Sequence, residues 1–238
     1  MQDIAQDRLR GITTALTLMV LCLSTPGARA ATALDAGNLA PGQLVISELM
    51  IDPTRVSDGA GEWFEIFNPF RIPIDLSGLV VESQTGSTVE NFTIKGAASV
   101  PAGGFFVLGR SAASGTNGGV TVDYAWGTAL SLGNTSDFLR IERSDGTILT
   151  QATWSEAPAG KSLELTSFTG PNLAHANFSA SLRAYGSGDF GTPGLRNSNP
   201  MTLTGLVAPP VPEPGTWALL ALGLGCISLT RSRNIRGT

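Results

Sequence analysis

The chain has 238 residues, of which 42% are hydrophobic and 14% charged, with 29 Gly and 14 Pro. This composition favours short strands and turns and argues against a helical bundle, which needs runs of Glu, Lys, Leu and Ala. Residues 31–230 hold nine Lys and Arg against seventeen Asp and Glu, which argues against nucleic acid as a partner, because binding phosphates takes clustered basic residues.

Residues 1–30 have the parts of a secretory signal peptide. Two arginines give the segment a positively charged N-terminal region, and residues 12–23 form an apolar run. Ala28 and Ala30 supply the small residues that signal peptidase recognises. We therefore expect cleavage after Ala30. The alternatives are an uncleaved anchor or a core helix, but about a dozen apolar residues are too few to span a bilayer.

One folded domain is expected at residues 43–197, between a flexible lead-in (31–42) and a linker stiffened by proline (198–211). No window of eleven or more residues there sustains a helical period, whereas short apolar runs alternate with turn signals. We expect strands near residues 43–51, 62–68, 78–83, 90–95, 104–109, 120–124, 137–143, 147–154 and 161–166. Eight or nine strands at this spacing predict an all-β fold, an antiparallel β-sandwich.

The hairpin between the strands at 137–143 and 147–154 has the clearest turn. Asp145-Gly146 stands between the two runs, and this dipeptide favours the positive φ values of a tight turn. In the first of these strands Leu139 and Ile141 face one way while Arg140 and Glu142 face the other, which is the pattern of a half-buried antiparallel strand.

Seven short motifs follow one another along this domain. They are LVISELM (44–50), GEWFEIFNP (61–69), IDLSG (74–78), VPAGG (100–104), LGN (132–134) before Asp137, GKSLE (160–164), and GTPG (191–194) before Asn197. In this order they resemble the bacterial lamin tail domain, over nearly all of residues 43–197. The resemblance implies an immunoglobulin-like β-sandwich, in agreement with the strand pattern, and it implies no catalytic residues.

Side chains suited to chemistry are sparse in this domain. The two cysteines, Cys22 and Cys226, both lie in the apolar terminal segments, so the domain has neither disulfides nor thiolate metal ligands. The one histidine, His175, has no Gly-x-Ser-x-Gly motif to serve, and we interpret it as a surface-loop residue. We expect no catalytic residue, no cofactor and no enzyme activity.

Glu48 and Glu65 are the strongest candidates for a polar site. Glu48 lies in a nearly continuous apolar strand, and Glu65 alternates with Trp63 and Phe67, which places these three on one face. If the two strands are neighbours, the carboxylates could pair with Arg140 or bind calcium through oxygen ligands. We favour the alternative that each accepts hydrogen bonds and serves packing.

Aromatic side chains lie in or next to several expected strands. They are Trp63, Trp126, Trp154, Phe105 and Phe106. We interpret them first as core residues and second as platforms on which sugar rings could stack.

The C-terminus combines three parts in order. Val211, Pro212, Glu213 and Pro214 cannot form a helix, because proline fixes φ and restricts the residue before it. Residues 216–230 carry no charge and would form a helix about 22 Å long, short against a hydrocarbon core of about 30 Å. We expect a transmembrane segment there, with a buried core helix as the alternative.

The chain ends in three arginines, Arg231, Arg233 and Arg236. They are expected on the cytoplasmic side, which leaves the domain outside. This three-part tail, residues 212–238, resembles the PEP-CTERM sorting signal of Gram-negative bacteria. The resemblance implies that exosortase, a membrane protease, reads the Pro-Glu-Pro residues and cleaves the tail near them. Its substrates tend to be surface or matrix proteins of exopolysaccharide-producing bacteria.

These features predict an exported, non-catalytic protein of the cell surface or extracellular matrix of a Gram-negative bacterium, held at the inner membrane during sorting. The expected partners are signal peptidase, exosortase, the membrane for a short time, and an exopolysaccharide or surface protein as ligand. The alternative is a secreted hydrolase or a calcium-dependent carbohydrate-binding module.

Overall fold

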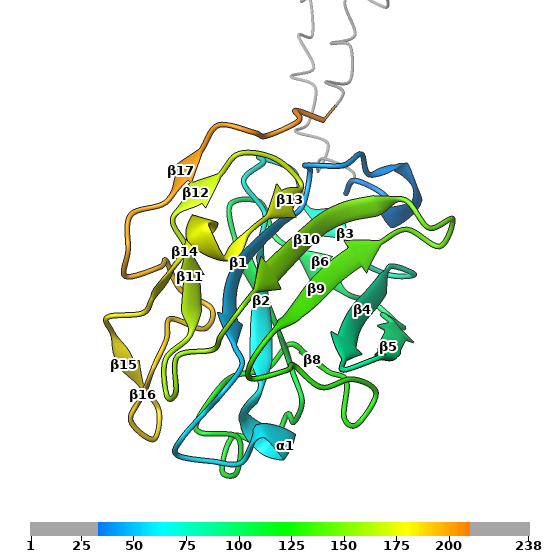
Figure 1. Cartoon of the computed structure of the whole chain (residues 1–238). Coiled ribbons are helices and arrows are strands. Elements are labelled where there is room, and N and C mark those ends of the chain that lie inside the picture. The colour runs from blue at the N-terminus through cyan, green and yellow to red at the C-terminus, as the bar shows by residue number, and fades with distance from the viewer. Residues whose placement is uncertain (1–32, 210–238) are drawn as a thin grey trace, which may run out of the picture. The chain divides into compact units, whose positions relative to one another are not determined.

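A computed structural model describes residues 33–209, which form two packed β-sheets (Figure 1). The signal peptide expected at residues 1–30 and the sorting tail expected at 212–238 lie outside the described residues. Within residues 33–209 no helix is long and apolar enough to cross a membrane. The transmembrane segment expected at 216–230 belongs to the part of the chain that is not described.

The first sheet has six strands in the order β14-β11-β1-β2-β7-β8. Their bounds are Phe178–Ala180 (β14), Leu163–Leu165 (β11), Val45–Met50 (β1), Trp63–Phe67 (β2), Phe105–Gly109 (β7) and Tyr124–Ala125 (β8). Neighbouring strands are antiparallel, except that β7 and β8 are parallel.

The second sheet has five strands in the order β13-β10-β9-β4-β5. Their bounds are Asn172–Leu173 (β13), Ile148–Trp154 (β10), Asp137–Glu142 (β9), Val80–Thr85 (β4) and Thr88–Thr93 (β5). Here too the pairing is antiparallel apart from one parallel pair, β10 with β13.

Short elements complete the described fold. The remaining two-residue strands are Ile74–Asp75 (β3), Ser99–Val100 (β6), Ser167–Phe168 (β12), Ala184–Tyr185 (β15), Asp189–Phe190 (β16) and Thr202–Leu203 (β17), paired as β3 with β6, β12 with β17, and β15 with β16. One short α-helix spans Asp58–Gly61 (α1), and two 3₁₀ turns span Ala36–Asn38 (η1) and His175–Asn177 (η2).

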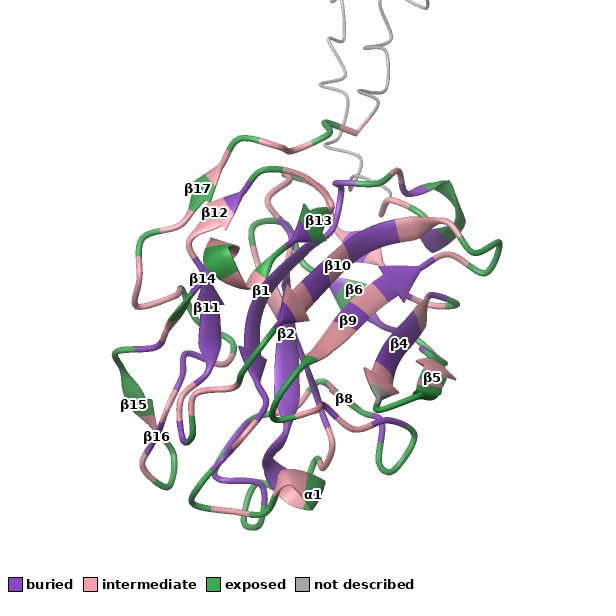
Figure 2. Cartoon of the chain, in the orientation of Figure 1, coloured by how far each residue is buried: buried purple, intermediate pink, exposed green. Residues whose placement is uncertain are grey.

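The two sheets pack face to face around one apolar core (Figure 2). On β9, Leu139 and Ile141 are fully buried in that core, while Arg140 on the other face is partly exposed, so the predicted alternation of this strand is confirmed. Phe64 and Ile66 of β2 contribute to the same core from the first sheet. The all-β, immunoglobulin-like antiparallel sandwich predicted from the sequence is confirmed.

Eight of the nine expected strands are present, with ends that differ by no more than two residues. The exception is 120–124, where only Tyr124–Ala125 (β8) is a strand. The reason is local, because the side-chain amide of Asn117 bonds both the N–H and the carbonyl of Val120 and so occupies the groups that a ladder would use. β14 and the two-residue strands other than β8 were not predicted, since such short elements have no periodicity to detect.

The predicted hairpin turn is confirmed. The Gly146 N–H donates to the Arg143 carbonyl at 2.9 Å, and the Arg143 N–H donates to the Thr147 carbonyl at 3.0 Å. Gly146 has φ of +83°, a left-handed conformation that glycine adopts without steric cost. The glycine therefore lets β9 turn directly into β10.

The described parts of the expected lead-in and linker, residues 33–42 and 198–209, are packed on the sandwich instead of running free of it. Leu39 is fully buried, and Leu34 pairs with Ile74 beside β3. At the other end, β17 pairs in parallel with β12, and the Val207 N–H donates to the Gly42 carbonyl at 3.3 Å. Both segments carry apolar side chains, and packing these on the sandwich removes them from water.

Candidate functional site

The outer face of the six-stranded sheet, opposite the core, carries three glutamates side by side. Glu164 of β11, Glu48 of β1 and Glu65 of β2 stand on adjacent strands, with Glu48 the register partner of both others. All three residues are fully buried. A bulge at Ser47 lies beside this row, because the register shifts by one residue between Ile46 and Glu48. The expected proximity of Glu48 and Glu65 is therefore real, and Glu164 extends the row.

The row is covered by residues 181–199, which we call the strap. The strap includes β15 and β16 and crosses the outer face at the β11 side of the sheet (Figure 1). Thr192 donates to Glu48 from its backbone N–H at 2.8 Å and from its hydroxyl at 2.7 Å. The Gly194 N–H donates to Glu65 at 2.6 Å. The strap thus places a backbone donor on each of these two carboxylates.

Glu164 holds the C-terminal end of the strap. The backbone N–H groups of Ser198 and Asn199 donate to its two oxygens at 3.0 and 2.8 Å. The hydroxyl of Ser181, at the other end of the strap, donates to the same carboxylate at 2.7 Å, and the Asn199 amide donates at 2.8 Å. One buried side chain therefore fixes both ends of the strap.

Close packing accompanies these hydrogen bonds where the strap crosses β2. The Trp63 ring N–H donates to the Tyr185 hydroxyl at 3.1 Å, and the two rings meet edge to face. A Cβ atom on Gly191 would lie 3.0 Å from the Trp63 ring and 3.2 Å from a Glu48 oxygen. Only glycine lets the backbone at residue 191 come this close to Trp63 and Glu48 without displacing a neighbour.

The three glutamates differ in the pKa of their carboxyl groups. Burial raises the pKa of Glu48 to about 7, although hydrogen bonds from Ser162 and Thr192 oppose the shift. Burial and the neighbouring Glu48 charge raise the pKa of Glu65 well above its ordinary value. For Glu164, burial also acts to raise the pKa, but the donors from Ser198, Asn199 and Ser181 outweigh it and the pKa is lowered. The most hydrogen-bonded carboxylate is thus the one that ionises most readily.

The arrangement makes Glu48 and Glu65 hydrogen-bond acceptors that fasten the strap. The suggested pairing with Arg140 is not formed, because Arg140 belongs to the other sheet and bonds Glu82 at 2.7 Å and Glu142 at 3.1 Å. Among residues 33–209 no three His, Cys, Asp or Glu side chains cluster in a way that could hold a metal. Calcium at Glu48 and Glu65, the less favoured alternative from the sequence, stays untested.

A groove opens where the outer face is not covered by the strap. Phe67, Gly103 and Phe105 line one side, and residues 196–201 with Leu203 line the other, around a volume of about 450 Å³. Phe67 and Phe105 are register partners on β2 and β7, and their ring centroids lie 4.9 Å apart. Both rings are half-buried, whereas Arg196 is exposed.

A second hollow, of about 420 Å³, surrounds a buried ion pair. Arg110 donates to Glu62 at 2.9 Å, and Glu62 is only 2% exposed. Burial raises the pKa of Glu62 to about 7, although Arg110 opposes the shift. Asp58 and Asn134 border the hollow and bond each other at 3.1 Å. Arg110 and Glu62 both line the hollow and bond each other there.

The aromatic residues singled out from the sequence divide into two groups. Trp63, Trp126, Trp154 and Phe106 are each less than 9% exposed, so their interpretation as core is confirmed. Phe105 is half-buried and lines the groove with Phe67. Of the five, Phe105 is the one placed where a ligand could reach it.

His175 begins the 3₁₀ turn η2 and is partly exposed. Within the described residues its side chain makes no hydrogen bond to a serine or a carboxylate, and its Nδ1 atom is buried without a partner. The sorting residues Val211, Pro212, Glu213, Pro214, Arg231, Arg233 and Arg236, and the cleavage residues Ala28 and Ala30, lie outside the described part of the chain.

Two family models match the chain. The model of the Lamin Tail Domain matches residues 38–156, and that of the PEP-CTERM protein-sorting motif matches residues 210–233. No curated protein matches it. The first match ends just after β10, so β11 with Glu164, the strap and one side of the groove lie beyond the matched region.

Proposed function

The chain belongs to the lamin tail domain family, and on that premise we propose that its sandwich is a non-catalytic binding or structural module displayed at the cell surface. The chain also carries a PEP-CTERM sorting motif, which makes it an exported surface protein sorted by exosortase. The order of the two parts, a sandwich followed by a sorting motif at the C-terminus, is the observation that carries the proposal.

The course of sorting follows from the terminal segments. Signal peptidase removes residues 1–30 after Ala30, and the span at 216–230 holds the protein at the inner membrane of a Gram-negative bacterium. Exosortase then reads Pro212, Glu213 and Pro214 and cleaves near them. The lamin-tail-type domain, centred on residues 43–197, is released from the arginine tail to the surface or matrix.

The non-catalytic role is supported by how the buried carboxylates are used. Glu48, Glu65 and Glu164 each accept hydrogen bonds from the strap. A general acid or base must instead exchange protons with a substrate within hydrogen-bond reach. The strap covers this row, so the carboxylates serve the framework of the domain.

The sorting step can be tested on the full chain, with an epitope tag in the sandwich, expressed in a host that contains exosortase. Mass spectrometry of the surface protein is expected to find a C-terminus near residues 212–214, without Arg231, Arg233 and Arg236. The Pro212→Ala variant is expected to stay uncleaved at the inner membrane. Pro209→Ala is the matched control and is expected to be processed normally.

An intact arginine tail on mature surface protein would contradict cleavage. A cleaved Pro212→Ala variant would contradict the role given to that proline. Retention of both variants at the membrane would show that any change near the tail disturbs sorting.

A further inference from the structure

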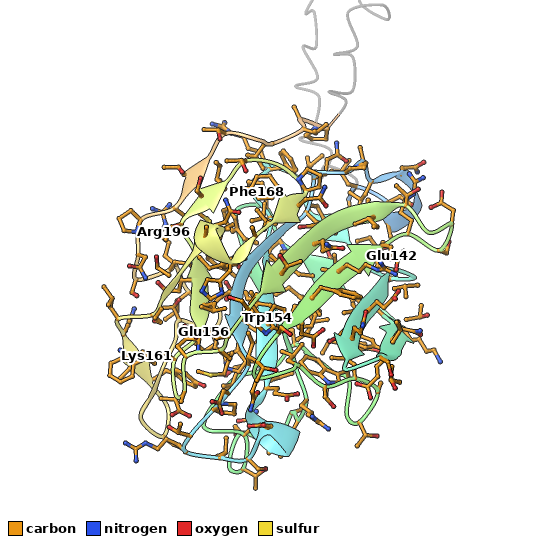
Figure 3. All side chains as sticks on the ribbon, in the orientation of Figure 1. Glu142, Trp154, Glu156, Lys161, Phe168 and Arg196 are labelled. Atoms are coloured by element: carbon orange, nitrogen blue, oxygen red, sulfur yellow. The ribbon has the colours of Figure 1, made fainter. Side chains whose placement is uncertain are left out.

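The groove lies on the same outer face as the glutamate row, at the end where β2 stops and β7 begins. The strap crosses the row and then runs along the edge of the groove at residues 196–199, leaving Phe67 and Phe105 uncovered on one side. Figure 3 shows Arg196 on the side of the domain formed by β12, β14 and β17. The groove is therefore built by three stretches of the chain, Phe67, residues 103–105 and residues 196–203, the last of which continues from the strap.

The floor of the groove is aromatic and apolar. The Phe67 and Phe105 rings are tilted by 31° to each other, and Met201 and Leu203 also line the groove. Half-buried aromatic rings at a surface present a rigid apolar area at little entropic cost. Such a floor suits a ring whose faces carry C–H groups and whose rim carries hydroxyls, as a sugar ring does.

One cation stands at the edge of this floor. Among the ion pairs of residues 33–209, none involves Arg196, and its guanidinium makes no hydrogen bond to another described residue. Six of the nine Lys and Arg side chains in these residues form no ion pair, and among the six Arg196 is the one that lines the groove. A guanidinium with free N–H groups binds a carboxylate through two parallel hydrogen bonds.

We propose that the groove binds a uronic acid unit of an acidic polysaccharide, with the sugar ring on Phe67 and Phe105 and its carboxylate on Arg196. This inference rests on the proposed surface function and names its ligand class. The volume of about 450 Å³ lies within the range of about 300–1,000 Å³ that is usual for ligand sites. A polymer would cross the groove and place one or a few units in it.

The test is a calorimetric titration of the purified full-length chain in detergent with an oligogalacturonate, and with its methyl ester as the neutral counterpart. The acidic oligosaccharide is expected to bind and the ester to bind at least about tenfold more weakly, because the ester cannot form the charge-assisted pair. Binding is also expected to weaken with added salt, since Arg196 is exposed.

Two variants locate the site. Arg196→Gln is expected to weaken oligogalacturonate binding about tenfold or more. Arg183→Gln is the matched control, because Arg183 is an exposed strap residue that does not line the groove, and its binding is expected to be unchanged. Circular dichroism spectra of both variants should match the parent.

Three results would overturn the proposal. They are no binding of oligogalacturonate, equal binding of its methyl ester, or equal loss in the two arginine variants. Binding of a peptide with the sequence of residues 208–215, in place of the oligosaccharide, would assign the groove to peptide docking instead. Failure of the titration alongside normal sorting and tail removal would reject this site while leaving the proposed surface function in place.

Discussion

The inner and outer faces of the six-stranded sheet are both buried, but different forces bury them. The inner face is apolar, and Phe64 and Ile66 are fully buried in the core that it shares with the second sheet. The outer face buries Glu48, Glu65 and Glu164 beneath the strap. Apolar burial is non-directional and grows with area, whereas each buried carboxylate needs donors in fixed positions. The inner face therefore supplies stability, and the outer face determines where the strap lies.

This difference also explains why one end of the outer face is left open as a groove. Hydrogen bonds from the strap to the glutamate row fix its path over that part of the outer face. Beyond the row, Phe67 and Phe105 offer the strap no acceptor. That end of the face stays open, and the groove lies there.

The largest effect is expected from a change on the inner face. Phe64→Ala removes a fully buried ring that stacks on Trp126 and should lower the free energy of unfolding by about 3–5 kcal/mol. Urea denaturation followed by tryptophan fluorescence measures this. The loss should affect the whole domain, so hydrogen exchange should speed up in β9 as well as in the strap. A loss below about 1 kcal/mol would contradict the assignment of Phe64 to the core.

A change on the outer face should have a smaller and more local effect. Glu164→Ala leaves the N–H groups of Ser198 and Asn199 without their acceptor and should cost about 2–3 kcal/mol. Hydrogen exchange of these two amides should speed up, while the amides of β9 keep their protection.

Glu156→Ala is the matched control for the Glu164 variant. Glu156, labelled in Figure 3, is exposed, and such surface changes typically alter stability by less than about 0.5 kcal/mol. If Glu164→Ala loosened β9 as much as the strap, the division between a stabilising inner face and a positioning outer face would fail.

The pH dependence of stability separates the faces further, because the outer face carries Glu48 and Glu65, two buried carboxyl groups with raised pKa values. Glu48 has its pKa raised from 4.5 to about 7 in the fold, so the folded chain holds its proton more tightly than the unfolded chain. Between these two values the folded state binds more protons, and stability should fall as pH rises. From pH 5 to pH 7 the contribution of Glu48 should decline by about 2 kcal/mol.

Glu48→Gln isolates this contribution, since the amide does not titrate but keeps an oxygen for Thr192. Denaturation between pH 5 and pH 7 should show a shallower decline for this variant than for the parent. The decline should not vanish, because Glu62 and Glu65 also have raised pKa values. Parallel curves for parent and variant would contradict the role of Glu48.

Much of the site could be approached from the sequence, but not its extent. The alternation of Trp63, Glu65 and Phe67 predicts their shared face, and the structure pairs β1 with β2 as that hypothesis required. Glu164 was not predicted as a member of the row. The alternation of Ser162, Leu163 and Glu164 weakly indicates that Glu164 and Leu163 face opposite sides of the sheet. Nothing in the local sequence indicates that β11 pairs with β1 and not with another strand.

The all-β class, most strand positions, the turn at Gly146 and the two family resemblances can all be recognised in the sequence alone. All of these depend on local features: side-chain alternation, glycine conformation and the order of short motifs. The folded structure was needed to show that three glutamates from separate strands form one row, that residues 181–199 cover it, and that Arg196 lines one groove with Phe67 and Phe105. Those relations depend on register and pairing between segments distant in the chain, which are set by packing of the whole domain and leave no local pattern.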